Sequence, residues 1–460
     1  IEVIALFAHR SHRQVAMTAG PLLPNVLAFA VPLILSGMLQ LLYNSADIIV
    51  VGRFADSVAM ASVGATTSLI HLLVSLLMGL SVGASVAVAR AAGAGDRDGV
   101  HRAVHTSMAL AVLSGAALGV LLLVLSRPLL EMMGCPADVV GGAQLYLNIY
   151  AVGLPASLVY NYGAAILRAV GDTKRPLYYL TVSGLCNVVL NVALVAGLRL
   201  GVAGVAIATV VSETISAALV LASLITSHGD VRFEPKKTRI ERRSLSMILR
   251  IGIPAGLQSS MFSISNVLIQ SAINSFGSTV VAGSSASSNL EGFVYTAMNA
   301  FAQAAVTFTS QNVGARRYDN LDRVMRNCLL CATVTGLVLG GGASLLGEQL
   351  LHFYSSDEVV VTAGLARMHI ICTTYLLCGG MDVLASCLRG RGYSVLPMVV
   401  SLVGSCLLRL VWIATIFQLF HTTTMLYLSY PVSWILTTLV HLACLLVVRH
   451  KMKTALSVKA

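Results

Sequence analysis

One carboxylate and three carboxamides stand inside the apolar stretches of the chain, at spacings that suit a cation site. Asp47 lies fifteen residues beyond Pro32, and Asn44 lies one helical turn before Asp47. Asn187 and Asn191 are also one turn apart, so that their oxygens can bind each other, a carboxylate or Na⁺. A carboxylate within a bilayer is costly unless it faces a partner, water or an ion. We therefore expect Asp47 to take up H⁺ or Na⁺.

Two plainer interpretations of these residues stay open. Asp47 can be a structural acid satisfied by hydrogen bonds, and Asn187 and Asn191 can simply join helices. Pro32 removes a backbone donor and can bend the first helix, so ion binding at Asp47 would be coupled to that bend.

The second half offers polar residues of a different kind. Asp382 and Arg409 are both intramembrane charges in the expected helices, and we expect them to pair with each other. Gln258 stands among serines on the seventh helix, and Glu291 on the eighth helix can face a substrate cleft. Glu213 on the sixth helix can face the same cleft.

The elements that position these residues are membrane helices. Of 460 residues, 57% are hydrophobic and only 11% are charged, which excludes an ordinary soluble protein. Apolar runs of membrane-spanning length predict twelve helices. They are expected at 22–51, 58–88, 103–126, 139–166, 176–198, 202–227, 246–275, 279–310, 326–350, 359–386, 395–420 and 424–448.

The basic residues set the expected orientation. With both termini in the cytoplasm, 25 of the 30 Lys and Arg residues fall in cytoplasmic segments. Arg53, Arg127 and Arg199 fall in the outside loops, and Arg367 and Arg409 fall within helices. This distribution explains the net charge of +11 without nucleic acid. The nine cysteines lie mostly in apolar runs and predict no disulfide framework.

An internal repeat divides the chain. At an offset of about 221, the stretch from Gly83 falls on the stretch from Ala304, and LRAVGDTKRP from Leu167 falls on LRGRGYSVLP from Leu388. Each half holds six helices, so the repeat is parallel and predicts two bundles around a central cleft. Such a duplication is typical of transport by alternating access.

This repeat gives the expected domains. We expect an upstream or poorly ordered extension at 1–16, an N-lobe at 17–228, a linker at 229–245, a C-lobe at 246–449 and a cytoplasmic tail at 450–460. We interpret the basic linker as a solvated loop.

The first helix, AVPLILSGMLQLLYNSADIIVVGRF, resembles that of the multidrug and toxic compound extrusion (MATE) family. The likeness continues through SQNVGA, LRAVGD, LRGRG and YPVSW. The resemblance implies a V-shaped pair of six-helix bundles, cation-driven export and an essential carboxylate at Asp47. Many relatives have Asp where this chain has Asn191, and some have Glu on the seventh helix, which is missing here. From the family pattern, the substrate cleft would include Gln40, Tyr43, Tyr160 and Met298, besides Gln258, Glu291, Asp382 and Arg409.

We therefore expect an all-α membrane antiporter, not an enzyme, that exports organic and often cationic compounds in exchange for H⁺ or Na⁺. The alternative is a flippase or exporter of a lipid-linked or saccharide precursor, whose anionic cargo favours arginines in the cleft. No cofactor, metal site or nucleic-acid partner is expected beyond the coupling ion. The expected setting is a monomer in the cytoplasmic membrane of a bacterium, with the lipid bilayer and small organic substrates as partners.

Overall fold

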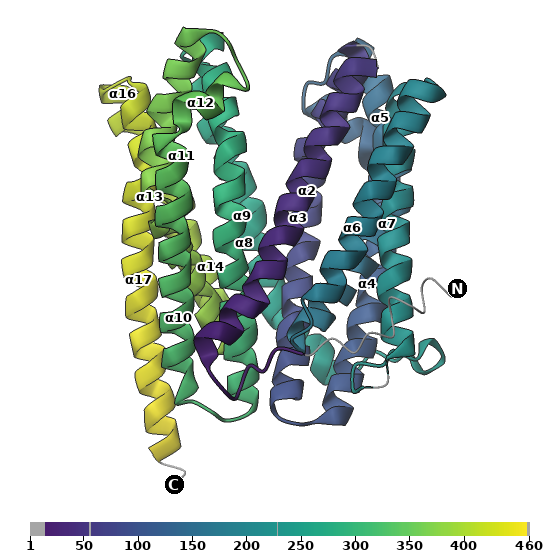
Figure 1. Cartoon of the computed structure of the whole chain (residues 1–460), viewed down its shortest axis with the longest axis vertical. Coiled ribbons are helices and arrows are strands. Elements are labelled where there is room, and N and C mark those ends of the chain that lie inside the picture. The colour runs from purple at the N-terminus through teal and green to yellow at the C-terminus, as the bar shows by residue number, and fades with distance from the viewer. Residues whose placement is uncertain (1–13, 55–56, 228, 458–460) are drawn as a thin grey trace. The chain divides into compact units, whose positions relative to one another are not determined.

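Twelve long helical segments make up the chain in the computed structural model, which describes residues 14–54, 57–227 and 229–457 (Figure 1). No β-strand occurs within these ranges. The first six segments are α2 (Leu22–Phe54), α3 (Ser57–Gly93), α4 (Arg97–Met132), α5 (Ala137–Ala169), α6 (Lys174–Asn191) with η1 (Val192–Gly197), and α7 (Gly201–Thr226). The short η2 (Pro235–Lys237) precedes α8 (Arg242–Asn274), α9 (Ser278–Gly314), α10 (Asn320–Thr335) with η3 (Gly336–Gly340) and α11 (Gly341–Leu345), α12 (Gly347–His352), and α13 (Glu358–Gly390). The last two segments are α14 (Val395–Ser401) with η4 (Leu402–Leu407), α15 (Leu408–Ala414) and α16 (Ile416–Leu419), and α17 (Thr423–Ser457).

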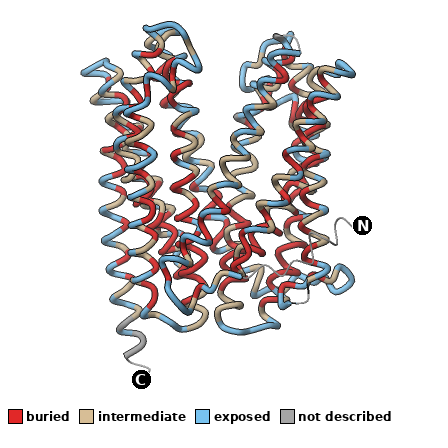
Figure 2. Tube along the Cα trace, viewed as in Figure 1, coloured by how far each residue is buried: buried red, intermediate tan, exposed pale blue. Residues whose placement is uncertain are grey.

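Composition explains why these segments are helices that span a bilayer. Ten of the described segments are long and apolar enough to cross a membrane. The helices α8 and α9 are of similar length, at 33 and 37 residues, but carry many Ser, Asn and Gln residues. Each helix presents both buried and exposed positions along its length (Figure 2). All twelve segments coincide with the expected spans.

The turns of the two halves repeat the same backbone solutions. Gly171 and Gly392, which the internal repeat pairs, have φ of 92° and 98°. Gly95 has φ of 67°, and its counterpart Arg316 has φ of 58° although it is not a glycine. These left-handed residues end helices, where glycine is the usual choice. The glycines of LRAVGD and LRGRG are thus required by the turn.

Two compact units divide the chain, and both contain part of its first helix. Among the described residues, the first unit comprises 14–16 and Leu35–Gly256, and the second comprises Met17–Ile34 and 257–457. The expected division at the linker therefore differs from the observed one, which passes through α2 and α8. Both changes come three residues after a proline, Pro32 in α2 and Pro254 in α8.

Glycines allow α3 and the first part of α8 to approach closely within the first unit. A Cβ on Gly79 would lie 2.7 Å from the carbonyl oxygen of Gly252, and one on Gly252 would lie 2.6 Å from Cα of Leu80. A Cβ on Gly83 would lie 3.0 Å from the nitrogen of Gly252. Small residues four apart on each helix permit this backbone contact, as at many membrane helix interfaces.

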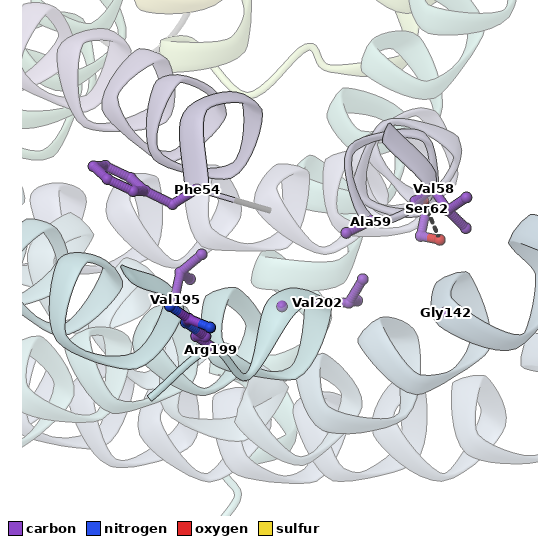
Figure 3. A pocket seen from close by; sticks show the side chains of 9 residues that line it. Phe54, Val58, Ala59, Ser62, Gly142, Val195, Arg199 and Val202 are labelled. Atoms are coloured by element: carbon purple, nitrogen blue, oxygen red, sulfur yellow. Dashed lines mark hydrogen bonds between the residues drawn. The ribbon is translucent and has the colours of Figure 1, made fainter. Parts of the chain in front are cut away.

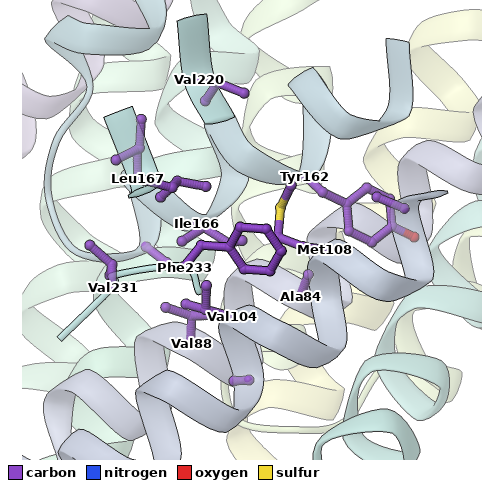
Figure 4. Close-up of a cluster of buried hydrophobic side chains, with 14 of the residues drawn as sticks. Ala84, Val88, Val104, Met108, Tyr162, Ile166, Leu167, Val220, Val231 and Phe233 are labelled. Carbon is purple, nitrogen blue, oxygen red and sulfur yellow. The ribbon is translucent and has the colours of Figure 1, made fainter. Parts of the chain in front are cut away.

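The linker is exposed over most of its length, as its charge suggests, but two of its apolar residues are anchored in the first unit. Val231 and Phe233 are buried in the largest hydrophobic cluster of the first unit, against residues of α4 and α5 (Figure 4). The backbone nitrogen of Glu234 donates to Nε2 of His105, and Arg102 pairs with Glu241 at 3.2 Å. The burial of Val231 and Phe233 anchors the linker to the first unit. The basic residues around them made this alternation of apolar side chains difficult to recognise in the sequence.

Candidate functional site

Asp47 lies in a chain of neutral polar side chains inside the first unit. Nδ2 of Asn191 donates to Oδ1 of Asp47 over 2.6 Å and to Oδ1 of Asn187 over 3.1 Å. Nδ2 of Asn187 reaches Oγ of Ser212 on α7 at 3.4 Å. Asn187 and Asn191 are buried, whereas Asp47 is partly exposed. The sequence-based grouping of Asp47 with the two asparagines of α6 matches this geometry.

No base clamps this carboxylate. Among the residues that the structure describes, no Lys, Arg or His side chain lies within 4.0 Å of Asp47 as an ion pair. Oδ1 of Asn191 is buried and has no hydrogen-bond partner in the described part of the chain. The cluster thus presents a carboxylate and an unused carbonyl oxygen, both of which are ligands for a hard cation.

A second acid, Glu213 on α7, lies near the same cluster, whereas the sequence indicated it only as a residue that can face the cleft. Its Oε1 accepts from Oγ of Ser157 over 3.2 Å, and its Oε2 is buried with no partner among the described residues. Tyr146 interacts electrostatically with both Asp47 and Glu213. Glu213 directly follows Ser212, which ends the chain of hydrogen bonds from Asp47, so only the structure connects this acid to the cluster.

The other candidates of the first half have varied surroundings. Asn44 and Gln40 are exposed on α2, and Asn44 has no hydrogen bond to Asp47 in the described residues. The hydroxyl of Tyr43 donates to the carbonyl of Thr181 over 3.4 Å, and its ring packs on Gly184. The hydroxyl of Tyr160 donates to the carbonyl of Pro176 over 3.2 Å. Asn44 therefore does not extend the Asp47 cluster as expected.

A pocket of about 350 Å³ lies beyond the Asp47 cluster in the first unit (Figure 3). Phe54 follows Asp47 by two helical turns on α2, and Val195 follows Asn191 by one turn. Arg199 supplies the positive charge of the lining. The lining residues are Phe54, Val58, Ala59, Ser62, Gly142, Val195, Arg199, Gly201 and Val202.

In the second unit, Glu291 is held in a buried ion pair instead of facing an open cleft. Nε and Nη2 of Arg367 donate to its two carboxylate oxygens over 2.7 and 2.8 Å. Nη1 of Arg367 donates to Oγ of Ser284, and Ser287 donates to Glu291 over 2.9 Å. Glu291 is 3% exposed and Arg367 6% exposed. The sequence missed this pair because Arg367 lies 76 residues away.

The expected pair of Asp382 and Arg409 does not form in the described structure. Nε of Arg409 donates to Oγ of Ser433 over 2.8 Å, and its guanidinium lies 4.3 Å from the ring centroid of Tyr430. Asp382 interacts instead with Tyr295 and Arg389. The neighbours of Arg409 are thus an aromatic ring and a hydroxyl group instead of the expected carboxylate.

Gln258 and Met298 are both buried inside the second unit. Gln258 accepts from Arg389 and donates to Ser401. Met298 is 1% exposed and packs where Gly336 and Gly379 leave space. Both side chains are almost fully inaccessible to solvent, at 4% and 1% exposed.

Each half of the chain resembles a known protein family. The family model MatE matches residues 32–193 and 254–415, once in each half of the chain. The chain belongs to the MATE family. As a MATE member it is a multi-pass membrane transporter, and the twelve helices in two matched halves are the family's fold.

Two relatives and one solved structure illustrate the likeness. The chain is 26% identical to the probable multidrug resistance protein YoeA of Bacillus subtilis over 381 residues, which is 81% of this chain and 82% of that protein. It is 26% identical to the probable multidrug resistance protein YpnP of the same organism, over 85% of this chain and 88% of that protein. A MOP superfamily transporter from Pyrococcus furiosus superposes with a TM-score of 0.90 at 21% identity, covering 97% of this chain and all of that chain (100%). This last likeness is one of fold.

Proposed function

We propose that this MATE transporter is a secondary active exporter of organic compounds, driven by H⁺ or Na⁺ through Asp47. The observation that carries the proposal is the 2.6 Å bond from Asn191 to Asp47, a carboxylate with neutral neighbours. A carboxylate in an ion pair with a basic side chain would keep that partner and would not be free to bind a coupling ion. One held by an amide can exchange that contact for a proton or a cation.

The coupling follows from competition for one charge. A cationic substrate and the coupling ion both require the negative form of Asp47, so that binding one disfavours the other. Export then uses the inward ion gradient if ion binding and substrate binding alternate. The relatives YoeA and YpnP are named as probable multidrug resistance proteins, which favours lipophilic organic compounds as the transported substrates.

Glu213 extends the proposed site. Because Asn191 cannot titrate, a second negative charge near Asp47 must come from elsewhere, and Glu213, like Asp47, is an electrostatic neighbour of Tyr146. We propose that Glu213 binds the second of two protons, or supports Na⁺ together with Asp47. The pocket beyond the cluster is the proposed route of the ion, since it begins one turn from Asn191.

The remaining expectations are proposed together with this function. The transporter would lie in the cytoplasmic membrane with both termini in the cytoplasm, because the basic residues lie mostly on one side. It would work as a monomer without a cofactor.

The test is efflux from proteoliposomes with an imposed ΔpH or Na⁺ gradient. Asp47→Asn should lower gradient-driven efflux of a lipophilic cation by more than tenfold, while the exposed acid variant Asp138→Asn leaves it unchanged. Comparing the two gradients identifies the coupling ion. Wild-type efflux by Asp47→Asn would refute the coupling role.

A second candidate function has one observation in its favour. Arg409 is 3% exposed, and no carboxylate pairs with it in the described residues. Its neighbours Tyr430 and Trp434 are flat aromatic rings, and Trp434 stacks on Tyr375 at 5.4 Å. A buried cation beside aromatic rings suits a flat anionic compound or an anionic precursor.

The two cargo classes can be separated directly. Efflux of a cationic dye and of an anionic flavin nucleotide should be measured in the same vesicles. The first function predicts efflux of the dye alone, whereas nucleotide efflux that depends on Arg409 but not on Asp47 would favour the second.

A further inference from the structure

A basic loop at residues 235–243 joins the linker to α8, and its path is fixed by α4. Just before the loop, the backbone nitrogen of Glu234 donates to Nε2 of His105. Near its end, the backbone nitrogen of Glu241 donates to Oγ1 of Thr106 over 3.1 Å. The segment between these two bonds, which includes η2, is therefore attached on both sides to neighbouring residues of α4. The basic loop thus has a defined position on the first unit.

The acids around the basic loop are already paired within the first unit. The linker contains three acids, and their ion pairs are Asp230 with Arg97 at 3.5 Å, Glu234 with Lys237 at 2.6 Å and Glu241 with Arg102 at 3.2 Å. In the described residues, no ion pair involves the other four basic residues of the loop, which are Lys236, Arg239, Arg242 and Arg243. All four are exposed. The loop therefore presents positive charges that no nearby carboxylate neutralises.

The basic loop leads directly into a helix of the membrane domain. The helix α8 begins at Arg242, and its apolar span is expected from residue 246 onward. Four residues of helix rise by about 6 Å, which is roughly the depth of the head-group layer on one side of a bilayer. Arg242 and Arg243 therefore lie at the depth of lipid phosphates.

The exposed face of α8 within the first unit continues the charge of the loop. Arg243, Ser246, Arg250 and Ile253 are all exposed, and their sequence spacing places them on one side of the helix. The other side carries Gly252, which packs closely against α3. The arginines are thus turned away from the interior of the unit. Their long side chains can cover apolar surface and still extend the guanidinium groups to the head groups.

We propose that the basic loop binds the head groups of anionic phospholipids at the end of α8. Guanidinium groups bind phosphate oxygens through two parallel hydrogen bonds, and basic clusters beside a membrane helix are typical lipid-binding segments. An acidic soluble protein would complement the loop, but it would not account for the exposed Arg250 farther along the helix. The occupant is therefore a lipid. This inference concerns the bilayer and not the cargo, so it does not depend on Asp47.

The first test measures lipid affinity. The purified full chain in a neutral detergent is titrated with phosphatidylglycerol or with phosphatidylcholine, and native mass spectrometry measures the bound lipid. The wild type should bind phosphatidylglycerol about tenfold more tightly than phosphatidylcholine or better. The triple variant Lys236→Gln, Arg239→Gln and Arg243→Gln should lose this preference, because each basic residue near an anionic surface contributes about fivefold to binding.

A matched control removes three exposed basic residues from α6 and α10, by Lys174→Gln, Arg323→Gln and Arg326→Gln. It changes the net charge equally and should keep the preference for phosphatidylglycerol. Equal losses in the two triple variants would show a general attraction of a positive chain and would overturn the proposal. An unchanged preference in the loop variant would overturn it as well. So would glycerol phosphate that competes as strongly as the lipid, because the loop would then be a site for small anions.

The second test needs no variant. The wild type is placed in nanodiscs of phosphatidylcholine, with or without phosphatidylglycerol, and is digested briefly with trypsin. Phosphatidylglycerol should slow cleavage after Lys236 and Lys237 by about threefold or more, and should leave cleavage after the exposed Arg316 unchanged. High salt should abolish the difference, because it screens the attraction. Equal cleavage of the loop in both kinds of nanodisc would contradict lipid binding. Neither test measures transport, so failure of the proposed ion coupling would leave both results intact.

Discussion

Nδ2 of Asn191 donates to Asp47, while Oδ1 of the same asparagine is buried and accepts from nothing in the described part of the chain. This one side chain therefore stabilises the carboxylate of Asp47 through its amide nitrogen and offers its amide oxygen beside it. A single substitution can turn the neutral partner into a second acid.

Asn191→Asp should move the pH dependence of efflux. Two carboxylates at hydrogen-bond distance cannot both ionise readily, so the pair would retain one proton to higher pH than Asp47 does alone. The pH at which efflux is half-maximal should therefore rise by about one unit or more. Efflux by reconstituted protein between pH 5.5 and 9 measures this shift. Asn191→Leu, which removes both the donor and the oxygen, should lower efflux at every pH, and a profile identical to the wild type would contradict the role of Asn191.

The pair of Arg367 and Glu291 should reveal itself in stability. Arg367→Met leaves a buried carboxylate without its partner and should destabilise the protein by about 3–5 kcal/mol. Arg367→Met combined with Glu291→Leu should restore most of that loss, because neither charge then remains buried. Thermal unfolding in detergent compares the three variants. Equal losses in the single and double variants would show that the pair does not interact.

The close approach of α3 and α8 predicts a strong dependence on side-chain size. Gly79→Ala places a methyl group against backbone atoms of α8 and should cost about 1–3 kcal/mol. Gly64→Ala on the same helix meets no atom within 4 Å and should be neutral or slightly stabilising. Unfolding temperature and the yield of folded protein separate the two variants, and similar values would contradict the packing.

The linker should depend on Phe233. Phe233→Ala removes a buried ring from the cluster with Val104 and Ile166, at a cost of about 3–5 kcal/mol if it unfolds with the core. If only the linker detaches, trypsin should cleave faster after the lysines at 236 and 237. Ile240→Ala, at an exposed position, is the matched control and should be cut at the wild-type rate.

Much of the fold could be predicted from the sequence, because apolar runs of bilayer length and the paired glycines of LRAVGD and LRGRG have few other solutions. The grouping of Asp47 with Asn187 and Asn191 was also accessible, since a carboxylate and an i, i+4 pair of amides are rare in such runs. The partners of charged residues on other helices could not be predicted. Arg367 pairs with Glu291, and Arg409 binds Ser433, because of how the helices are rotated about their axes. One sequence does not specify that rotation.

Charge also concealed some structure. The basic linker contains Val231 and Phe233 at alternate positions, a pattern easily overlooked among arginines and lysines. His441 is a further example. An isolated histidine in an apolar helix gives no signal in the sequence, whereas in the structure its Nε2 lies 3.2 Å from Oγ of Ser401 on another helix.

The shared membership of α2 and α8 has a consequence for biosynthesis. The helix α2 is synthesised long before the rest of the second unit, to which it contributes Leu22–Ile34, and the first unit lacks its final helical turns until residue 256 has been synthesised. Neither half can therefore mature as an autonomous module, and cutting the gene at the linker would give two products that each need the other to complete their interior.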